Sequence, residues 1–297
     1  MATHTTSHPY HLVGRKASVR TRTEQIRGTV RGAALFGPRY FALLRSARSG
    51  DRQRMHEAER VWAKHAARAA DLTIETHGMH RIDPAAQYVV APLHEGFADV
   101  IALSKLPLDL AYSAAEELFD WKLLGRYLNA SQQCPVPLVN RAAAYRSMVR
   151  AAEASFCRDE SYVMFPQGSI LGIETAFHQG AFQLSARSGK PLLPVVLTGG
   201  ASVWEYPYAT NLNFGQTIRL EVLEPVDASE VLHCAGAIES EMKERALAAI
   251  PGPRRFNPDR DGWWDDYPYE IDPAFAELAD RVAEHRANRR SAPAAHR

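Results

Sequence analysis

The sequence contains no apolar run that approaches the roughly 20 residues of a transmembrane helix. Its first residues also lack the charged start and apolar core of a signal peptide. Only three cysteines are present, Cys134, Cys157 and Cys234, and this odd, widely spaced set argues against a disulfide framework or a zinc site. These absences predict a cytoplasmic protein with reduced thiols and no bound metal.

Charge is unevenly distributed along the 297 residues, although the net charge of the whole chain is only +1. Residues 1–70 contain 14 Lys and Arg against 4 Asp and Glu, which gives +10, so the rest of the chain carries −9. The shares of hydrophobic (46%) and charged (23%) residues are ordinary for a globular protein. A basic segment attached to such a body indicates an anionic partner for that segment.

The basic N-terminal region divides into two parts. Residues 1–22 are polar and are predicted to be disordered, whereas residues 23–70 are predicted to be helical, with an apolar patch at residues 33–44 between arginines. This composition fits a helix that lies on an anionic membrane through residues 27–48, at the inner face of the membrane. A helical pair packed on the main domain fits it as well. Nucleic acid is not expected, because aromatic residues are not interleaved with the basic ones along the segment.

Strand-like and helix-like stretches alternate through residues 71–250. Apolar runs such as residues 88–93 are typical of buried strands, and amphipathic runs such as residues 116–128 and 142–157 are typical of helices. The alternation predicts an α/β domain with a central, mostly parallel sheet flanked by helices and preceded by the N-terminal helical segment. Residues 251–297 are predicted to form an aromatic, acidic tail with a last helix, which either packs on the body or offers a partner surface.

A histidine and an aspartate occupy the turn after the strand predicted at residues 88–93. Pro92 and Gly96 interrupt the apolar run, so His94 lies at a strand end and Asp99 at a helix start. On one continuous helix, side chains five positions apart point about 140° away from each other, so these two meet only if the turn folds them together. Paired in that way, the carboxylate would orient the imidazole as a general base. Taken alone, the pattern also fits a loop histidine beside an aspartate that caps a helix.

No nucleophile motif accompanies this pair. The G-x-S-x-G motif of hydrolases is absent, and residues 168–172 have the wrong spacing for it. The base is therefore expected to act directly on a substrate hydroxyl. Two other strand ends carry candidate binding groups: Arg141 stands at a helix start where it suits an anion, and the turn at residues 165–169 contains a glycine that allows close approach of a ligand.

Four blocks in this order resemble a known family. The blocks are His94-Glu95-Gly96-Phe97-Ala98-Asp99, Val139-Asn140-Arg141, Phe165-Pro166-Gln167-Gly168-Ser169 and Leu193-Pro194-Val195. Their order and spacing, over about residues 72–225, are similar to those of the PlsC-type glycerolipid (lysophospholipid) acyltransferases of the HX4D superfamily. The resemblance implies transfer of a fatty acyl group from an acyl-CoA or acyl-carrier-protein thioester to a hydroxyl, commonly on a lysophospholipid or glycerol phosphate, with no further cofactor.

The resemblance also implies a role for each block. His94 would be the general base and Asp99 its orienting partner, while Arg141 would lie near a phosphate of the acceptor. The acceptor site would be shaped by the third block: Phe165, Pro166, Gln167, Gly168 and Ser169.

The third block departs from the family pattern Phe-Pro-Glu-Gly-Thr, which is often followed by Arg. Gln167 replaces the acid, Ser169 replaces the threonine, and Ile170 stands at the usual arginine position. Because phosphate recognition would lose a charge-assisted contact, the departures imply a divergent member that acylates another alcohol or an amine. Two other functions stay open: a membrane- or lipid-binding protein of the same fold that has lost the chemistry, and an acyl-thioester hydrolase.

Overall fold

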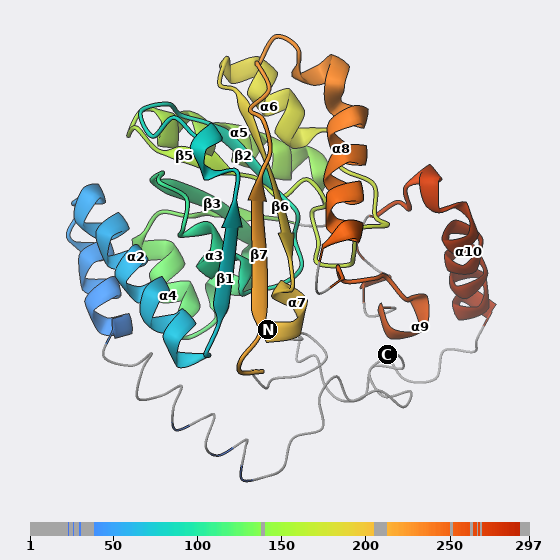
Figure 1. The fold of residues 1–297 in the computed structure, drawn as a ribbon, viewed down its shortest axis with the longest axis horizontal. Helices are drawn as coiled ribbons and strands as arrows, with labels where there is room; N and C mark the ends of the chain where they lie inside the picture. The colour runs from blue at the N-terminus through green and yellow to red at the C-terminus, as the bar shows by residue number, and fades with distance from the viewer. Residues whose placement is uncertain are drawn as a thin grey trace.

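Helices lie on both sides of a central sheet in the computed structural model (Figure 1). The structure describes residues 39–137, 140–204, 213–249, 252–261, 264, 265, 267 and 269–291, and the single positions 23, 26 and 30. Residues 1–22, which are predicted to be disordered, lie outside these described residues. So does most of the predicted membrane segment, residues 27–48, up to residue 38.

In the described part of the chain the central sheet has seven strands. They are β1 (Thr73–His77), β2 (Val89–Pro92), β3 (Leu110–Ala115), β4 (Cys134–Val136), β5 (Ser161–Val163), β6 (Leu192–Thr198) and β7 (Thr217–Val222). Their spatial order is β1-β7-β6-β2-β5-β3-β4. The strands from β6 to β4 run parallel, whereas β7 pairs antiparallel with β6 and parallel with β1. The predicted α/β fold with a mostly parallel sheet is confirmed.

Both faces of the sheet are buried, because its central strands are apolar at successive positions. In β2, Val89 and Ala91 belong to one hydrophobic cluster and Val90 belongs to the other. The first cluster includes side chains of α5 (Arg141–Phe156), α6 (Gly180–Ser188) and α8 (Val231–Ala248), and the second includes side chains of α3 (Asp99–Leu103). Helices on both faces are typical of parallel sheets and explain why the strands are apolar throughout rather than alternating.

The N-terminal helix α2 (Arg52–Ala69) packs its alanines against α3 and is tied to the domain by ion pairs. Arg52 and His56 both contact Glu160, a carboxylate that is almost fully buried. Burial by itself would lower the pKa of His56, but hydrogen bonds with Glu160 and Glu59 outweigh it and raise the pKa to about 9. The second half of the basic N-terminal region is therefore docked on the domain.

The single helix predicted over residues 116–128 is wrong, because the chain turns in the middle of it. A 3₁₀ turn, η2 (Glu116–Asp120), is followed by the extended residue Trp121 and then by α4 (Leu124–Ala130). Gly125 lies so close to the Phe119 carbonyl that a Cβ on it would be 1.9 Å from that oxygen. The leucines of this stretch line a cavity instead of forming one face of a helix. Their spacing in the sequence is nevertheless that of an amphipathic helix, which explains the wrong prediction.

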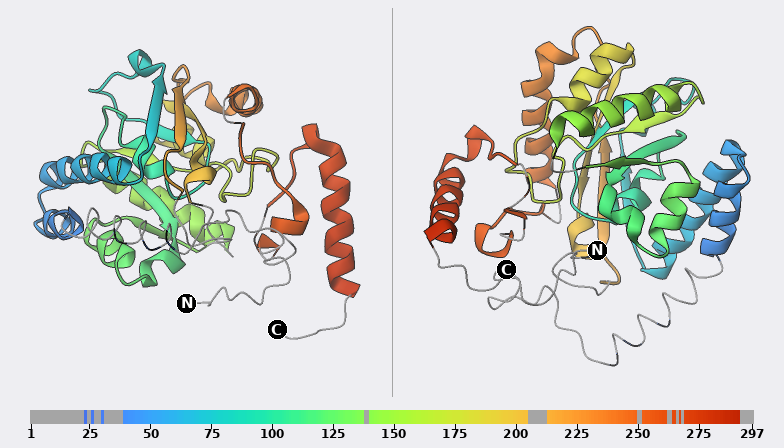
Figure 2. Two further views of the ribbon diagram at one scale, coloured as in Figure 1. Left: turned by 60° about the horizontal axis from the view of Figure 1, so that its bottom comes forward. Right: turned by 180° about the vertical axis from the view of Figure 1, so that it is seen from behind.

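Shorter elements complete the fold. They are η1 (Met79–Arg81), α7 (Gly200–Val203), α9 (Pro258–Asp261), η4 (Pro273–Phe275) and the longer helix α10 (Ala276–Ser291). Figures 1 and 2 show α10 on the side of the molecule opposite to α2. The C-terminal segment packs on the domain through Phe256, Trp264 and Tyr269, which contact Ile170 and Leu171 in one hydrophobic cluster. No helix among the described residues has the length and apolar character needed to cross a membrane.

Candidate active site

The turn between β2 and α3 folds His94 onto Asp99. The Nδ1 atom of His94 lies 2.8 Å from Oδ2 of Asp99. The same oxygen accepts hydrogen bonds from the backbone N–H groups of Glu95 (2.8 Å) and Gly96 (3.0 Å). Asp99 is fully buried, whereas His94 keeps 24% of its side chain exposed. His94 and Asp99, which could not meet on one continuous helix, are thus brought together by the turn.

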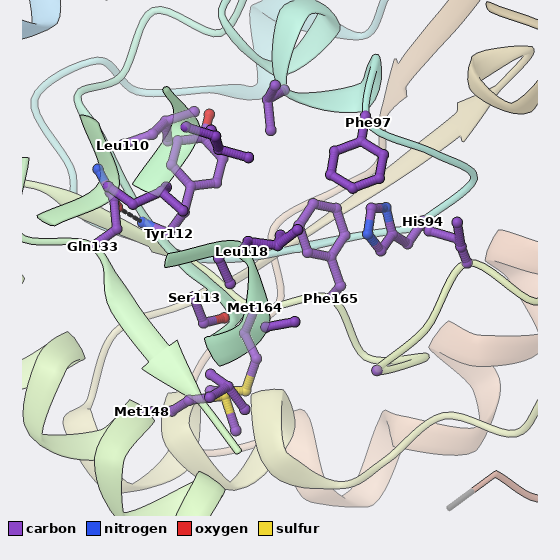
Figure 3. A pocket seen from close by; sticks show the side chains of 18 of the residues that line it. His94, Phe97, Leu110, Tyr112, Ser113, Leu118, Gln133, Met148, Met164 and Phe165 are labelled. Atoms are coloured by element: carbon purple, nitrogen blue, oxygen red, sulfur yellow. Dashed lines mark hydrogen bonds between the residues drawn. The ribbon is translucent and has the colours of Figure 1, made fainter. Parts of the chain in front are cut away.

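These contacts determine which nitrogen of the imidazole faces away from the carboxylate. An ionised carboxylate only accepts hydrogen bonds, so Nδ1 carries the proton of the neutral ring and Nε2 carries the lone pair. Nε2 has no hydrogen-bond partner among the described residues, and the ring lines a cavity (Figure 3). This arrangement gives the imidazole a basic nitrogen that a bound molecule can reach.

Two residues of the third block hold the histidine from another side. The Phe165 ring stacks on the imidazole, with ring centroids 3.9 Å apart and an angle of 22° between the planes (Figure 3). The side-chain oxygen of Gln167 accepts a hydrogen bond from the His94 backbone N–H at 2.6 Å. The NH₂ group of Gln167 donates to the Gly172 carbonyl at 2.7 Å. Because Gln167 is buried, these bonds are shielded from water and fix the backbone of His94.

The turn between β6 and α7 forms a wall behind Asp99. Gly200 lies so close that a Cβ built on it would be 2.1 Å from Oδ1 of Asp99. That oxygen is buried and has no hydrogen-bond partner in the part of the chain that the structure describes. Position 200 therefore has room only for glycine while Asp99 keeps its place.

Glu95, the residue after the histidine, is a second buried carboxylate at the site. Burial raises the pKa of Glu95 to about 7, and the nearby charge of Asp99 also raises it, while hydrogen bonds from backbone N–H groups act in the opposite direction. The sequence pattern assigns roles to His94 and Asp99 but gives no signal for Glu95, which lies between them.

A cavity of about 1040 Å³ opens beside the imidazole (Figure 3). Its walls come from β3, the η2–α4 turn, α5, the helix at residues 39–48 and the C-terminal segment. The lining residues labelled in Figure 3 are Phe97, Leu110, Tyr112, Ser113, Leu118, Gln133, Met148, Met164 and Phe165. Burying a CH₂ group is worth about 0.8 kcal/mol, so this cavity suits a long apolar group whose reactive end lies next to His94.

Comparison with known proteins finds similar sequences and a similar structure. Residues 73–198 match the Acyltransferase family model. A 1-acyl-sn-glycerol-3-phosphate acyltransferase of Bacillus subtilis (strain 168) is 28% identical over 117 residues, which cover 39% of this chain and 57% of that protein. Residues 73–198 of this chain are thus an acyltransferase-type segment.

Two further similarities concern larger parts of the chain. A 1-acyl-sn-glycerol-3-phosphate acyltransferase of Limnanthes alba is 27% identical over 138 residues, which cover 45% of this chain and 48% of that protein. The chain thus spans about half the length of these curated relatives. The crystal structure of the 1-acyl-sn-glycerophosphate (LPA) acyltransferase PlsC from Thermotoga maritima superposes with a TM-score of 0.59 at 16% identity, over 75% of this chain and 97% of that one. At that identity the likeness shows a shared fold.

In the acyltransferase-type segment, most of the third block faces the cavity. Phe165, Pro166, Gly168 and Ser169 line it. Gln167 does not line the cavity, because both ends of its amide are bonded to backbone groups behind the imidazole. The expectation that Gln167 contacts a substrate is therefore not matched by its position.

The second and fourth blocks of the acyltransferase-type segment have clear structural roles. Asn140 caps α5 by accepting a hydrogen bond from the Ala143 N–H at 3.0 Å. Arg141 begins α5, but its side chain and Val139 lie outside what the structure describes. The fourth block lies in β6, whose Val195 carbonyl accepts a hydrogen bond from the Leu93 N–H at 2.9 Å, so it supports the strand that leads into His94.

No three His, Cys, Asp or Glu side chains are grouped to hold a metal ion within the described residues. The three cysteines are free thiols.

Proposed function

We propose that this protein is an O-acyltransferase that moves a fatty acyl group from a thioester donor to the hydroxyl of a lysophospholipid-like acceptor. The observation that carries the proposal is the bonded His94–Asp99 pair at the mouth of an apolar cavity. The family match of residues 73–198 and the names of the relatives support the same chemistry. The donor would be an acyl-CoA or an acyl-carrier-protein thioester, and no further cofactor is required.

The proposed mechanism uses the free nitrogen of His94. The acceptor hydroxyl gives its proton to Nε2 while its oxygen attacks the carbonyl carbon of the thioester. The C–S bond of the resulting tetrahedral intermediate breaks, and the departing thiolate takes the proton from the imidazolium. Asp99 stays ionised, orients the ring and stabilises the imidazolium between the two proton transfers. The products are an ester and a free thiol.

The acceptor follows from the groups that face the cavity. In the position of Ile170, where relatives of this type commonly carry an arginine, the side chain is apolar and buried, so it offers no cation to a phosphate. Gln167 stands where the family usually has an acid, but its side chain lies behind the imidazole. This replacement therefore affects how His94 is held and does not affect contacts with the acceptor. Glycerol phosphate loses a charge-assisted contact at Ile170 and has no apolar chain to bury. We therefore favour a lysophospholipid-like acceptor or a related alcohol, whose apolar chain the cavity can hold.

We further propose that the protein works at an anionic membrane surface, on the cytoplasmic side. Phe41 (67% exposed) and Leu123 (59% exposed) lie at the cavity rim, and the Tyr40 hydroxyl joins their two segments by donating to the Leu123 carbonyl at 2.8 Å. Exposed cations on the same two segments include Arg45 and Lys122. Exposed apolar side chains with cations on the same segments suit a bilayer with anionic headgroups, and such a position would let a lipid enter the cavity directly.

Product analysis tests the proposed function. The purified protein is incubated with labelled acyl-CoA or acyl-carrier-protein thioester and a panel of lysophospholipids, glycerol phosphate, simple alcohols and amines, and the products are identified by mass spectrometry. Acylated lysophospholipid or alcohol is the expected result. Thioester loss without an acylated acceptor would identify a hydrolase, and lipid binding without turnover would identify a binding protein of the same fold.

A further inference from the structure

The Glu95 carboxylate makes contacts that the mechanism above does not use. Its Oε2 atom accepts a hydrogen bond from the Gly199 N–H at 2.6 Å, and its Oε1 atom accepts one from the Arg254 N–H at 2.8 Å. The N–H of Ala201 acts on this carboxylate as well, because it lowers the pKa of Glu95. Two backbone donors from two distant segments therefore converge on one side chain that is only 4% exposed.

The first of these segments forms the wall behind Asp99. Gly199 and Ala201 flank Gly200, whose Cα lies against Oδ1 of Asp99. The backbone N–H of Glu95 donates to the other oxygen of the same aspartate at 2.8 Å. Glu95 thus binds Asp99 through its backbone and binds the wall behind Asp99 through its side chain.

The second segment, residues 252–256, lies outside the region that matches the acyltransferase family, which ends at residue 198. This segment is also held by Glu174, another buried carboxylate, which accepts a hydrogen bond from the Phe256 N–H at 3.1 Å and pairs with Arg255 at 2.6 Å. Among the described residues, no hydrogen bond or ion pair joins Glu174 to the His94–Asp99 turn, whereas Glu95 is part of that turn. Glu95 therefore links the C-terminal segment directly to the candidate catalytic pair.

We propose that Glu95 is a positioning residue that clamps the His94–Asp99 turn between the β6–α7 turn and residues 252–256. A carboxylate suits this task because its ionised form only accepts hydrogen bonds and can satisfy several buried N–H groups at once. Buried backbone donors that lose their acceptor are costly, so these segments stay in place while the clamp is intact. The expected effect on the rate depends on the proposed acyl transfer, whereas the positioning of the turn by Glu95 does not depend on it.

The test compares Glu95→Gln with Glu174→Gln in the full-length protein. An amide places an NH₂ group where the backbone N–H donors need an acceptor, so either substitution should loosen the segments that its carboxylate holds. Hydrogen exchange measured by mass spectrometry reports on the amides at residues 196–204 and 252–258 without any need for activity. Steady-state acyl transfer gives kcat and KM for the same two variants.

Glu95→Gln is expected to speed exchange in both peptides and to lower kcat by about 10- to 100-fold with KM within twofold, because a misplacement of about 1 Å can cost 10² in rate. Glu174→Gln is expected to speed exchange only at residues 252–258 and to lower kcat less. Wild-type exchange at residues 196–204 together with wild-type kcat in Glu95→Gln would overturn the proposal.

Two other outcomes are also decisive. If the wild type shows no acyl transfer but Glu95→Gln still speeds exchange in both peptides, the proposed function fails and the clamp stands. If Glu95→Gln does not fold, Glu95→Asp replaces it, because this variant keeps the acceptor but shortens its reach by one CH₂ group. Glu95→Asp should then show the same two-peptide pattern, and its absence would overturn the clamp.

Discussion

Replacing Gly200 by alanine tests how tightly the Asp99 carboxylate is held. The new Cβ would lie 2.1 Å from Oδ1 of Asp99, whereas ordinary van der Waals contact begins at 3.4 Å. One of the two groups must therefore move by about 1.3 Å. Because β6 is buried along its whole length and Glu95 accepts a hydrogen bond from the N–H of Gly199, we expect most of the movement to fall on the Asp99 side chain.

The size of the effect follows from the bonds that Asp99 would lose. Its Oδ2 atom is bonded to the His94 ring at 2.8 Å and to two backbone N–H groups, and a shift of about 1 Å breaks or bends all three. Such a misplacement is worth about 10² in rate. A hydrogen bond to a charged group contributes about 1.5–3 kcal/mol, so the free energy of unfolding should fall by about 2 kcal/mol.

The assay follows release of the free thiol from acyl-CoA in the presence of a lysophospholipid acceptor, together with urea unfolding of the same samples. Gly236→Ala is the matched control, because position 236 lies in α8 and no atom would come within 4 Å of the new Cβ. This control should keep wild-type kcat and gain about 0.5–1 kcal/mol of stability, since alanine favours a helix interior. A folded Gly200→Ala protein with wild-type kcat would refute the reasoning.

Three further predictions concern residues around the site. Folding raises the pKa of Glu95 from 4.5 to about 7, so the contribution of this residue to stability is greatest at low pH and is lost as the pH rises through 7. In urea unfolding, the wild type should therefore lose about 3 kcal/mol relative to Glu95→Gln between pH 4.5 and pH 8. A difference that stays constant with pH would contradict this. Gln167→Glu should lower kcat about tenfold at pH 8, because a carboxylate cannot donate to the Gly172 carbonyl; an unchanged kcat would show that this bond does not support His94. Leu123→Ser should weaken sedimentation with phosphatidylglycerol vesicles about tenfold, whereas Leu247→Ser, which changes an exposed leucine of α8, should not; equal effects would argue against a specific membrane face.

Much of the sheet could be predicted from the sequence, because a strand buried on both sides must be apolar at successive positions. Val89, Val90 and Ala91 follow that rule, and the Pro92 and Gly96 breaks then locate the turn that joins His94 to Asp99. The reversed direction of β7 was not predicted, because the residue pattern of a single strand does not show in which direction its neighbours run.

Other features depend on contacts between distant segments, and local spacing cannot reveal them. The stretch at residues 116–128 has leucines at helical intervals, yet it bends because they face a cavity. Glu95 resembles an ordinary polar loop residue in the sequence, and its role depends on Gly199 and Arg254, which are 104 and 159 positions away. Gly200 is likewise explained only by the oxygen of Asp99 that lies beside it.

The central claim is that His94 removes the proton of the acceptor hydroxyl, and His94→Ala tests it most directly. The rate of labelled acyl transfer to the acceptor is measured for wild type and variant at saturating donor, with circular dichroism and urea unfolding to verify that both are folded. General-base catalysis contributes about 10²–10⁴ in rate, so the variant should lose at least about 10². A folded His94→Ala protein that transfers the acyl group at close to the wild-type rate would contradict the account.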